Sequence, residues 1–282
     1  MDFSGPALIM AIINCTDDSF YAPSGIQDIT TLHDKATMHD NAALHDKALE
    51  MALVAEREGA AIIDFGGESS RPGSSYISCE LELERVIPVI AAFRKRSTLP
   101  VSVDTRKAAV ARQALDAGAD IINDISGLSD DPGIAALCAE RGAGVVLMHK
   151  KGDPLTMQES PFYVNLVEEL RSWFKITTER AMAEGISAEK IIIDPGFGFG
   201  KGLEDNLEIL RRLAEICGKD YPVLVGLSRK SFIGEITGRD VEGRLSGTLA
   251  ANGAAIMGGA EIIRVHDVKE HVDLAKFLFT LH

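Results

Sequence analysis

The segment VSVDTRKAAVARQALDAGADIINDISG, residues 101–127, contains the unit from which the fold of this chain can be inferred. It begins with a β-branched run that stops at Asp104, and helix-forming sequence follows up to Gly118, a residue type that commonly ends helices. A second apolar run, Ile121–Asp124, comes almost directly afterwards. This connection is about the shortest that can join two parallel strands. The segment therefore predicts a strand, a crossover helix and a second, parallel strand.

The same unit recurs along the chain. Eight short apolar runs each end on polar or charged residues, and helix-forming sequence separates them. This alternation predicts a single-domain α/β fold, a (β/α)8 TIM barrel, in which active sites lie where the strands end. The predicted strands are Leu8–Asn14, Ala61–Asp64, Val101–Asp104, Ile121–Asp124, Val145–His149, Ile191–Asp194, Val223–Ser228 and Ile262–His266. The residues expected to converge at the mouth of the barrel are Asn14, Asp64, Asp104, Asn123, Asp194, Lys230, Arg264 and His266.

The composition is that of an ordinary globular protein. Hydrophobic residues make up 46% of the 282 residues, and the formal net charge is −13. This charge argues against a general binder of nucleic acid or anionic membrane, although it does not exclude an anionic small substrate. No apolar run is long enough to cross a bilayer, and no signal peptide is visible. The four cysteines are widely spaced, so we expect reduced thiols in a cytoplasmic protein.

Two motifs suggest ligand sites that closer inspection disfavours. The glycine-rich run PGFGFGKG, residues 195–202, lacks the Ser or Thr after Lys201 that a P-loop requires, and it also fails the dinucleotide pattern. Its better use is backbone that passes close to a flat ligand, with Phe199 as a wall. The repeat LHDKA, MHDNA, LHDKA at 32–48 contains three His, but a six-residue spacing turns them about 120° apart on a helix. We expect a solvated extension of the first barrel helix rather than a metal site.

Asp104, Asn123 and Asp194 form the most informative polar set. A carboxylate at a strand end often accepts hydrogen bonds from loop backbone, and that interpretation stays open for each aspartate alone. Together, however, the three residues offer acceptors and donors in one confined pocket. A carboxylate that faces a ring N–C–NH₂ edge can accept two parallel hydrogen bonds. The set therefore favours a planar heterocycle rich in N–H groups.

Positive charge is expected at the same mouth, from Arg71, Lys230, Arg264 and His266. Ser231 should lie near a helix N-terminus, which favours an anion. Asn14 can coordinate a hard cation through its amide oxygen. These residues predict an anionic ligand group beside the heterocycle.

At this point the motifs resemble those of the dihydropteroate synthase family, in the family's order and from about Leu8 to Phe277. The segments that carry the resemblance are INCTDDSF, IIDFGGESSRPGS, VSVDT, AGADIINDISG, VVLMHKKGDPLTMQ, IIIDPGFGFGK, NLEILRRL, VGLSRKSFIG and RLSGTLAANGAAIMGGAEIIRVHDV. The resemblance implies a transferase of folate biosynthesis. It would condense 6-hydroxymethyl-7,8-dihydropterin pyrophosphate with 4-aminobenzoate, releasing pyrophosphate, with Mg²⁺ as cofactor and sulfonamides as competitors. It also implies a homodimer.

The resemblance implies a role for each matching residue. The catalytic set would be Asp104, Lys230, Arg264 and His266. Pterin contacts would come from Asp104, Asn123, Met148, Asp194, Phe199, Lys230 and Arg264. The aminobenzoate side would comprise Phe20, Ser70, Arg71, Pro72, Lys230 and Ser231. Asn14, Arg264 and His266 would hold the pyrophosphate, and Asn14 would also be the metal ligand.

The chain departs from the family's pattern in three places. The first loop reads NCTDDSFYAPSG where the family is close to N-V-T-P-D-S-F-S-D-G-G, so Asp17 and Ala22 stand at altered positions. Ser70 stands where Thr is common. The repeat lengthens the segment after the first strand, at about 24–48. Two other functions stay open, a non-catalytic pterin-binding paralogue and a methyltetrahydrofolate–corrinoid methyltransferase, which would keep the pterin set but lack the DDSF, SSRPG and SRKS motifs.

Overall fold

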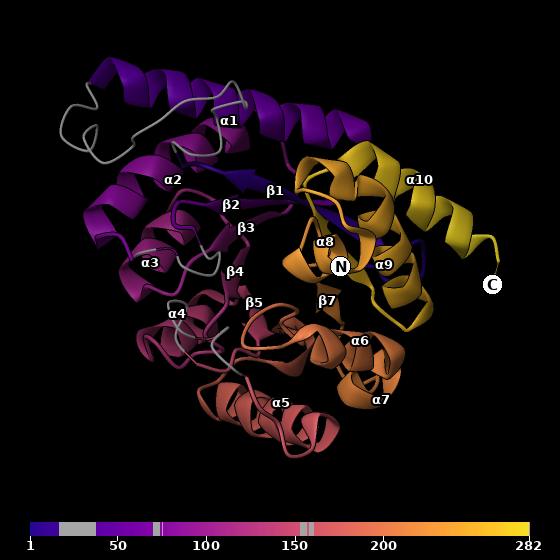
Figure 1. Cartoon of the computed structure of the whole chain (residues 1–282). Helices are drawn as coiled ribbons and strands as arrows, with labels where there is room; N and C mark the ends of the chain where they lie inside the picture. Colours follow the sequence, from indigo (N-terminus) through magenta and orange to yellow (C-terminus); the bar gives the residue numbers. More distant parts are fainter. Residues whose placement is uncertain (17–37, 70–73, 75, 153–156, 158–160, 282) are drawn as a thin grey trace.

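A computed structural model describes residues 1–16, 38–69, 74, 76–152, 157 and 161–281, apart from the side chains of 38–41. Eight parallel strands form one sheet that curves into a nearly closed barrel, in the order β6-β5-β4-β3-β2-β1-β8-β7 (Figure 1). They are β1 Leu8–Asn14, β2 Ile62–Gly66, β3 Val101–Asp104, β4 Ile121–Asp124, β5 Gly144–Met148, β6 Ile191–Asp194, β7 Leu224–Val225 and β8 Ile262–Val265. The predicted TIM barrel is confirmed.

Helices cover the outside of the barrel (Figure 1). They are α1 Met38–Glu58, α2 Cys79–Arg94, α3 Ala108–Asp116, α4 Gly133–Arg141, α5 Leu166–Ala183, α6 Leu203–Arg211, α7 Leu213–Cys217, α8 Ser231–Thr237, α9 Leu245–Met257 and α10 Val268–Phe279, with 3₁₀ turns at Ala188–Lys190 and Glu242–Arg244. Asn165 caps α5 by accepting from the Glu168 N–H, and Gly142 ends α4 in the left-handed conformation, as sequence rules for helix ends lead one to expect. Within the described part of the chain, no helix is both long and apolar enough to cross a membrane.

Side chains inside the barrel change character along the strands. A lower layer is apolar and comprises Met10, Ile62, Ile121, Val146, Ile192, Leu224 and Ile262. Because strand side chains alternate between two faces, the residue two positions further on points the same way. On β2, β4, β6 and β8 that residue is Asp64, Asn123, Asp194 and Arg264. These four residues, together with Asp104 of β3, are called the polar layer below.

Four of the eight predicted strands have other bounds than predicted. The fifth and eighth, predicted as Val145–His149 and Ile262–His266, each end one residue earlier, at Met148 and Val265, and the other two differ by more. The second strand does not end at Asp64 but continues to Gly66, where it pairs with Asp104, so Asp64 lies opposite Ser102 and one step below the rim. The seventh strand, predicted as Val223–Ser228, is only Leu224–Val225, because the backbone beyond Val225 forms no ladder. Its link to β6 is the isolated bridge between Ile193 and Val223, called the closing seam below.

The repeat lies partly within the described residues. Its second and third copies belong to α1, which packs against α2 on the outside of the barrel (Figure 1). His45 Nε2 lies 2.9 Å from the carbonyl oxygen of Glu84 on α2, so this histidine has a structural partner. The first copy lies outside the described residues, and the lengthened segment at about 24–48 stays a prediction.

Candidate active site

Hydrogen bonds join four of the five residues of the polar layer into one group centred on Arg264 and Asp64. From β8 its guanidinium donates through Nε to Asp64 Oδ2 at 2.7 Å and through Nη2 to Asp104 Oδ2 at 2.8 Å. Asn123 Nδ2 donates to the same Asp64 oxygen at 3.2 Å. The charges of Arg264 and Lys230 also act on Asp194 of β6. Side chains from β2, β3, β4, β6 and β8 therefore converge, as the strand-end pattern predicts.

Three oxygens of this layer remain available to a ligand. Asp194 Oδ1 accepts from the Gly196 N–H at 2.7 Å, the backbone contact that the sequence left open, but Oδ2 has no partner among the described residues. The same holds, within the described chain, for Oδ1 of Asp104 and Oδ1 of Asn123. Three acceptor oxygens on buried residues at one mouth suit a ligand that brings several N–H donors.

Burial raises the pKa of both Asp104 and Asp194, so each is a weaker acid than an exposed aspartate. It raises the pKa of Asp104 to about 7, with Asp64 adding to the rise and Arg264 opposing it. It raises the pKa of Asp194 to about 6, against the hydrogen bond from Gly196 and the charge of Lys230. A ligand that donates hydrogen bonds or carries positive charge would stabilise the ionised form of both. Perturbed carboxyls in a shared cavity are a frequent mark of a functional site.

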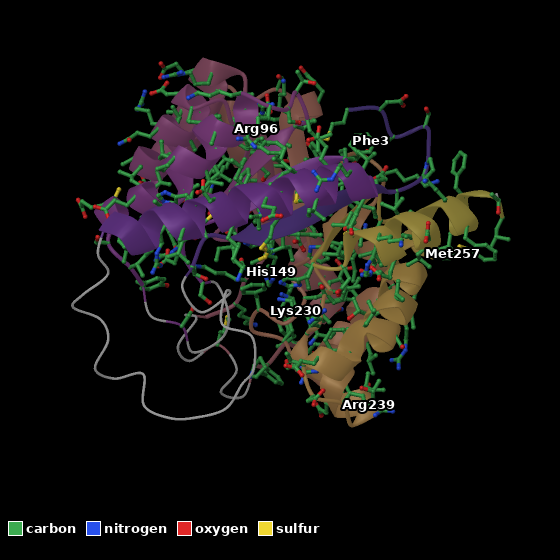
Figure 2. All side chains as sticks on the ribbon, turned by 90° about the horizontal axis from the view of Figure 1, so that it is seen from above. Phe3, Arg96, His149, Lys230, Arg239 and Met257 are labelled. Carbon is green, nitrogen blue, oxygen red and sulfur yellow. The ribbon has the colours of Figure 1, made fainter. Side chains whose placement is uncertain are left out.

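An apolar wall borders these acceptors. Ile125, Met148, Met157 and Phe199 form a buried cluster of their own. Met148 is the register partner of Asp194, and Lys230 Nζ lies 4.2 Å from the centre of the Phe199 ring. In Figure 2 the Lys230 side chain lies toward the centre of the molecule, whereas Arg239 and Met257 lie near its edge. Flat apolar walls beside acceptor oxygens can hold a planar ring.

The glycine-rich loop is bound to the protein itself rather than shaped to hold phosphate. Lys201 is buried, and its Nζ contacts His149 Nδ1 at 3.0 Å and donates to the carbonyls of His149, Gly196 and Phe199 at 3.2, 2.9 and 3.1 Å. Gly196 has φ +68°, and a Cβ there would collide with the His149 carbonyl. Burial lowers the pKa of Lys201 to about 7 and that of His149 to about 2. The lysine therefore fixes the loop that carries Phe199.

On the other side of the mouth, the structure orients His266 and the helix that follows Lys230. Ser228 Oγ lies 2.9 Å from Nδ1 of the exposed His266 imidazole and accepts from the His266 backbone N–H at 3.3 Å, so Ser228 fixes where this side chain stands. Ser231 is the first residue of α8, as predicted. Arg229, with φ +55°, pairs with Asp267 and so ties the loop after β7 to the end of β8.

Asn14 is half-buried at the end of β1, opposite Gly66. Its Oδ1 lies 3.8 Å from where a Cβ on Gly66 would stand, and Asp104 borders the same point. Among the described residues, no three His, Cys, Asp or Glu side chains could hold a metal together. A single amide oxygen nevertheless fits Mg²⁺, which usually takes one or two protein ligands and completes its shell with substrate phosphates and water.

A small cleft opens beside Asp104, and the other residues that line it were not predicted. Its lining includes Glu68, Tyr76 and Arg106. The Arg106 guanidinium stacks 3.4 Å over the Tyr76 ring and pairs with Glu68 at 3.3 Å. Glu68 and Arg106 each stand two residues beyond the end of a strand, so the strand-end rule could have found both.

Four predicted residues lie outside the described residues: Phe20, Ser70, Arg71 and Pro72. The side chain of Arg71 therefore cannot be added to the cations of the mouth. The roles of Asp64, Ser228 and Lys201 were not predicted, although Asp64 was expected at the mouth.

The barrel, its polar layer and the neighbouring apolar wall are the features of an enzyme that binds a flat, N–H-rich ring, and the comparisons name this class. Residues 10–266 match the family model described as pterin binding enzyme. The chain is 45% identical over 273 residues to the dihydropteroate synthase of Escherichia coli strain K12, a match that covers 97% of this chain and 90% of that protein.

Solved structures show the same relationship. A Yersinia pestis dihydropteroate synthase in complex with a sulfonamide drug superposes with a TM-score of 0.88 at 40% identity, covering 100% of this chain and 96% of that one. The Xanthomonas albilineans dihydropteroate synthase with 4-aminobenzoic acid gives 0.87 at 38%, covering 100% and 94%. The chain belongs to the dihydropteroate synthase family. The predicted transferase function in folate biosynthesis is thereby confirmed.

Proposed function

We propose that the polar layer binds 6-hydroxymethyl-7,8-dihydropterin pyrophosphate through its ring. Asp104, Asn123 and Asp194 accept from ring N–H and amino groups, and Lys230 donates to a ring acceptor. Met148 and Phe199 cover the faces of the ring, and Arg264 borders it from β8. The observation that carries this assignment is a set of three acceptor oxygens, on three buried residues, that have no partner in the described chain and lie next to the apolar cluster.

The pyrophosphate group belongs, on this proposal, at the β1 and β8 side of the mouth. His266 Nε2 and Arg264 supply donors there, and Asn14 supplies the protein oxygen for Mg²⁺. When bound, Mg²⁺ would neutralise charge on the leaving group. The Ser228 contacts support this assignment because they hold the His266 imidazole at the end of β8, beside Arg264.

The reaction then uses the charge of the polar layer. The bond between the pterin methylene carbon and the pyrophosphate oxygen breaks, and pyrophosphate leaves with the electron pair. The positive charge left on the methylene and ring is stabilised by the Asp104 carboxylate, while Arg264 and His266 stabilise the leaving group. The amine of 4-aminobenzoate forms the new C–N bond and releases a proton to solvent. No strong general base is required.

The second substrate belongs on the outer side of the pocket. Phe20, Ser70, Arg71 and Pro72 are assigned to 4-aminobenzoate by resemblance alone, with Lys230 and Ser231. The start of α8 at Ser231 supports an anion-binding role for this residue, since backbone N–H groups at a helix start point toward the ligand. Sulfonamides are expected to compete at this position.

Two further proposals come from the resemblance. The enzyme is proposed to be a homodimer, which sedimentation at twice the 30.3 kDa monomer mass would support. It is also proposed to be cytoplasmic, and the four free cysteines, Cys15, Cys79, Cys138 and Cys217, fit a reducing compartment.

The deciding experiment measures the binding of both substrates, the pterin pyrophosphate and 4-aminobenzoate, with the same enzyme preparation. The protein is incubated with the pterin pyrophosphate, Mg²⁺ and 4-aminobenzoate, and dihydropteroate is quantified. Asp194→Asn is expected to weaken pterin binding at least about tenfold, the size of one charge-assisted hydrogen bond, with the KM for 4-aminobenzoate unchanged. Turnover with a normal pterin affinity in Asp194→Asn would contradict the assignment of the ring site.

A further inference from the structure

Asp64 lies below the substrate-facing residues yet contacts two of them. It is fully buried, and its register partners are Ile12 on β1 and Ser102 on β3. Its Oδ2 accepts from Arg264 on β8 and from Asn123 on β4, so one oxygen links strands on either side of β2 that are not its neighbours. Its Oδ1 has no hydrogen-bond partner among the described residues.

The contact with Arg264 divides the guanidinium between two carboxylates. A guanidinium facing one carboxylate normally forms two parallel hydrogen bonds to it. Here Nε is bound to Asp64 and only Nη2 reaches Asp104, through Oδ2. Oδ1 of Asp104 is left without a partner in the described chain. Without the Asp64 charge, both arms of Arg264 would turn to Asp104 and cover both of its oxygens.

The contact with Asn123 fixes the direction of an amide. The Nδ2 group of Asn123 has an acceptor only if it faces Asp64, so the hydrogen-bond pattern assigns the amide in that orientation. Oδ1 then faces away from Asp64 and is free to accept. A rotated amide would present a donor to a ring edge that is itself rich in donors.

We infer that Asp64 is a positioning residue, whose carboxylate holds Arg264 and Asn123 so that Asp104 and Asn123 each keep one oxygen for the N–H groups of the pterin ring. The inference rests on the proposed ring site. It adds a residue that does not itself touch the substrate. It also explains why a charged residue is fully buried directly above the apolar lower layer.

The test compares Asp64→Asn with Ser102→Ala. Asp64→Asn keeps the shape of the side chain and removes its charge. Its affinity for the pterin pyrophosphate, measured by calorimetry, is expected to fall about tenfold or more, with an unchanged KM for 4-aminobenzoate. Ser102 lies at the same depth, and its buried hydroxyl has no partner among the described residues. Ser102→Ala is therefore the matched control, expected to bind the pterin as the wild type does.

A second readout separates positioning from simple loss of structure. Asp64 raises the pKa of Asp104, so its charge removal should move the acid limb of kcat/KM to lower pH. Arg264→Lys provides a further background, because an ammonium cannot divide itself between the two carboxylates. Adding Asp64→Asn to Arg264→Lys should weaken pterin binding less than Asp64→Asn does in the wild type.

The outcomes are distinguishable. Normal pterin affinity in Asp64→Asn, with weakened binding in Asp194→Asn, would overturn the role of Asp64 and leave the ring site intact. Normal affinity in both variants would overturn the ring site and this inference with it. If Asp64→Asn does not fold, Asp64→Ser takes its place with the same expected loss, since a water can then occupy the position facing Arg264.

Discussion

The lower and upper halves of the barrel interior are built from the same strands, but the lower half stabilises the fold and the upper half carries the binding groups. In the lower half, Ile62, Ile192 and Ile262 are buried among other apolar side chains, and each contributes roughly 1.5–3 kcal/mol of burial free energy. Two residues further along the same strands stand Asp64, Asp194 and Arg264. Burying charges costs free energy unless they are paired, and one oxygen of Asp194 has no hydrogen-bond partner among the described residues. The apolar lower layer therefore stabilises the fold, whereas the polar layer lowers its stability and in return can bind a ligand.

The largest effect is expected for Asp104→Asn, which tests whether the polar layer acts in catalysis. The carboxylate is needed mainly when positive charge develops on the pterin, so kcat should fall by about 10²–10³-fold, with a smaller loss of pterin affinity. Single-turnover kinetics and calorimetry would measure the two quantities. Wild-type turnover with weakened binding would reduce Asp104 to an anchor of the ring.

The converse change lies one layer lower, at Ile62→Ala. Ile62 is fully buried and precedes Asp64 by two residues. The free energy of unfolding should fall by about 2–5 kcal/mol, while the folded enzyme keeps its kcat/KM. Ile62→Val is the graded control, at about 0.5–1.5 kcal/mol. A loss of activity without a loss of stability would show that the two layers are not separable.

Lys201→Met tests a charged residue whose role is structural. The change leaves the carbonyls of His149, Gly196 and Phe199 without their donor, which should cost roughly 1–3 kcal/mol of stability. Pterin affinity should also fall, because Phe199 sits on the loosened loop. Denaturant unfolding and calorimetry would report both. Unchanged stability would mean that water replaces the ammonium without cost.

The pH profile offers a smaller effect with a defined sign. The pKa of Asp104 is raised to about 7 in the folded protein, so its proton-bound form favours folding and that contribution is lost as pH rises through about 7. Activity requires the ionised Asp104, so it should rise with pH over the range in which this contribution to stability is lost. The kcat/KM of the free enzyme should fall about fivefold between pH 7 and pH 6, because the ionised fraction of a group with a pKa of about 7 falls by that factor. An acid limb that persists unmoved in Asp104→Asn would assign it to another group.

The smallest effect is expected on the outer wall, at His45→Ala. This residue of the repeat contacts the Glu84 carbonyl on α2, away from the strand ends. Stability should change by less than about 1 kcal/mol, and turnover should stay at the wild-type value. A marked loss of turnover in the folded variant would connect the repeat to the active site.

The strand-end rule predicted most of the site from the sequence, because a parallel barrel brings every carboxyl end to one face whatever the spacing along the chain. It placed Asp104, Asn123, Asp194 and Arg264 together correctly. It could not show that Arg264 divides itself between two aspartates, since this depends on Asp64 lying one register step lower, and register is not visible in a single strand. Lys201 was recognised only as part of a failed phosphate motif. Its carbonyl partners are backbone atoms, which carry no sequence signal.

The closing seam also determines how compliant the pocket is. Asp194 ends β6 and Lys230 follows β7, so these two groups stand on opposite sides of the one junction held by a single bridge, between Ile193 and Val223. Elsewhere the neighbouring strands are joined by ladders of two to five register pairs. At the proposed ring site, the pterin would therefore lie across the junction with the fewest paired residues. We expect the slot to change its width more easily at this junction than between strands that are joined by ladders.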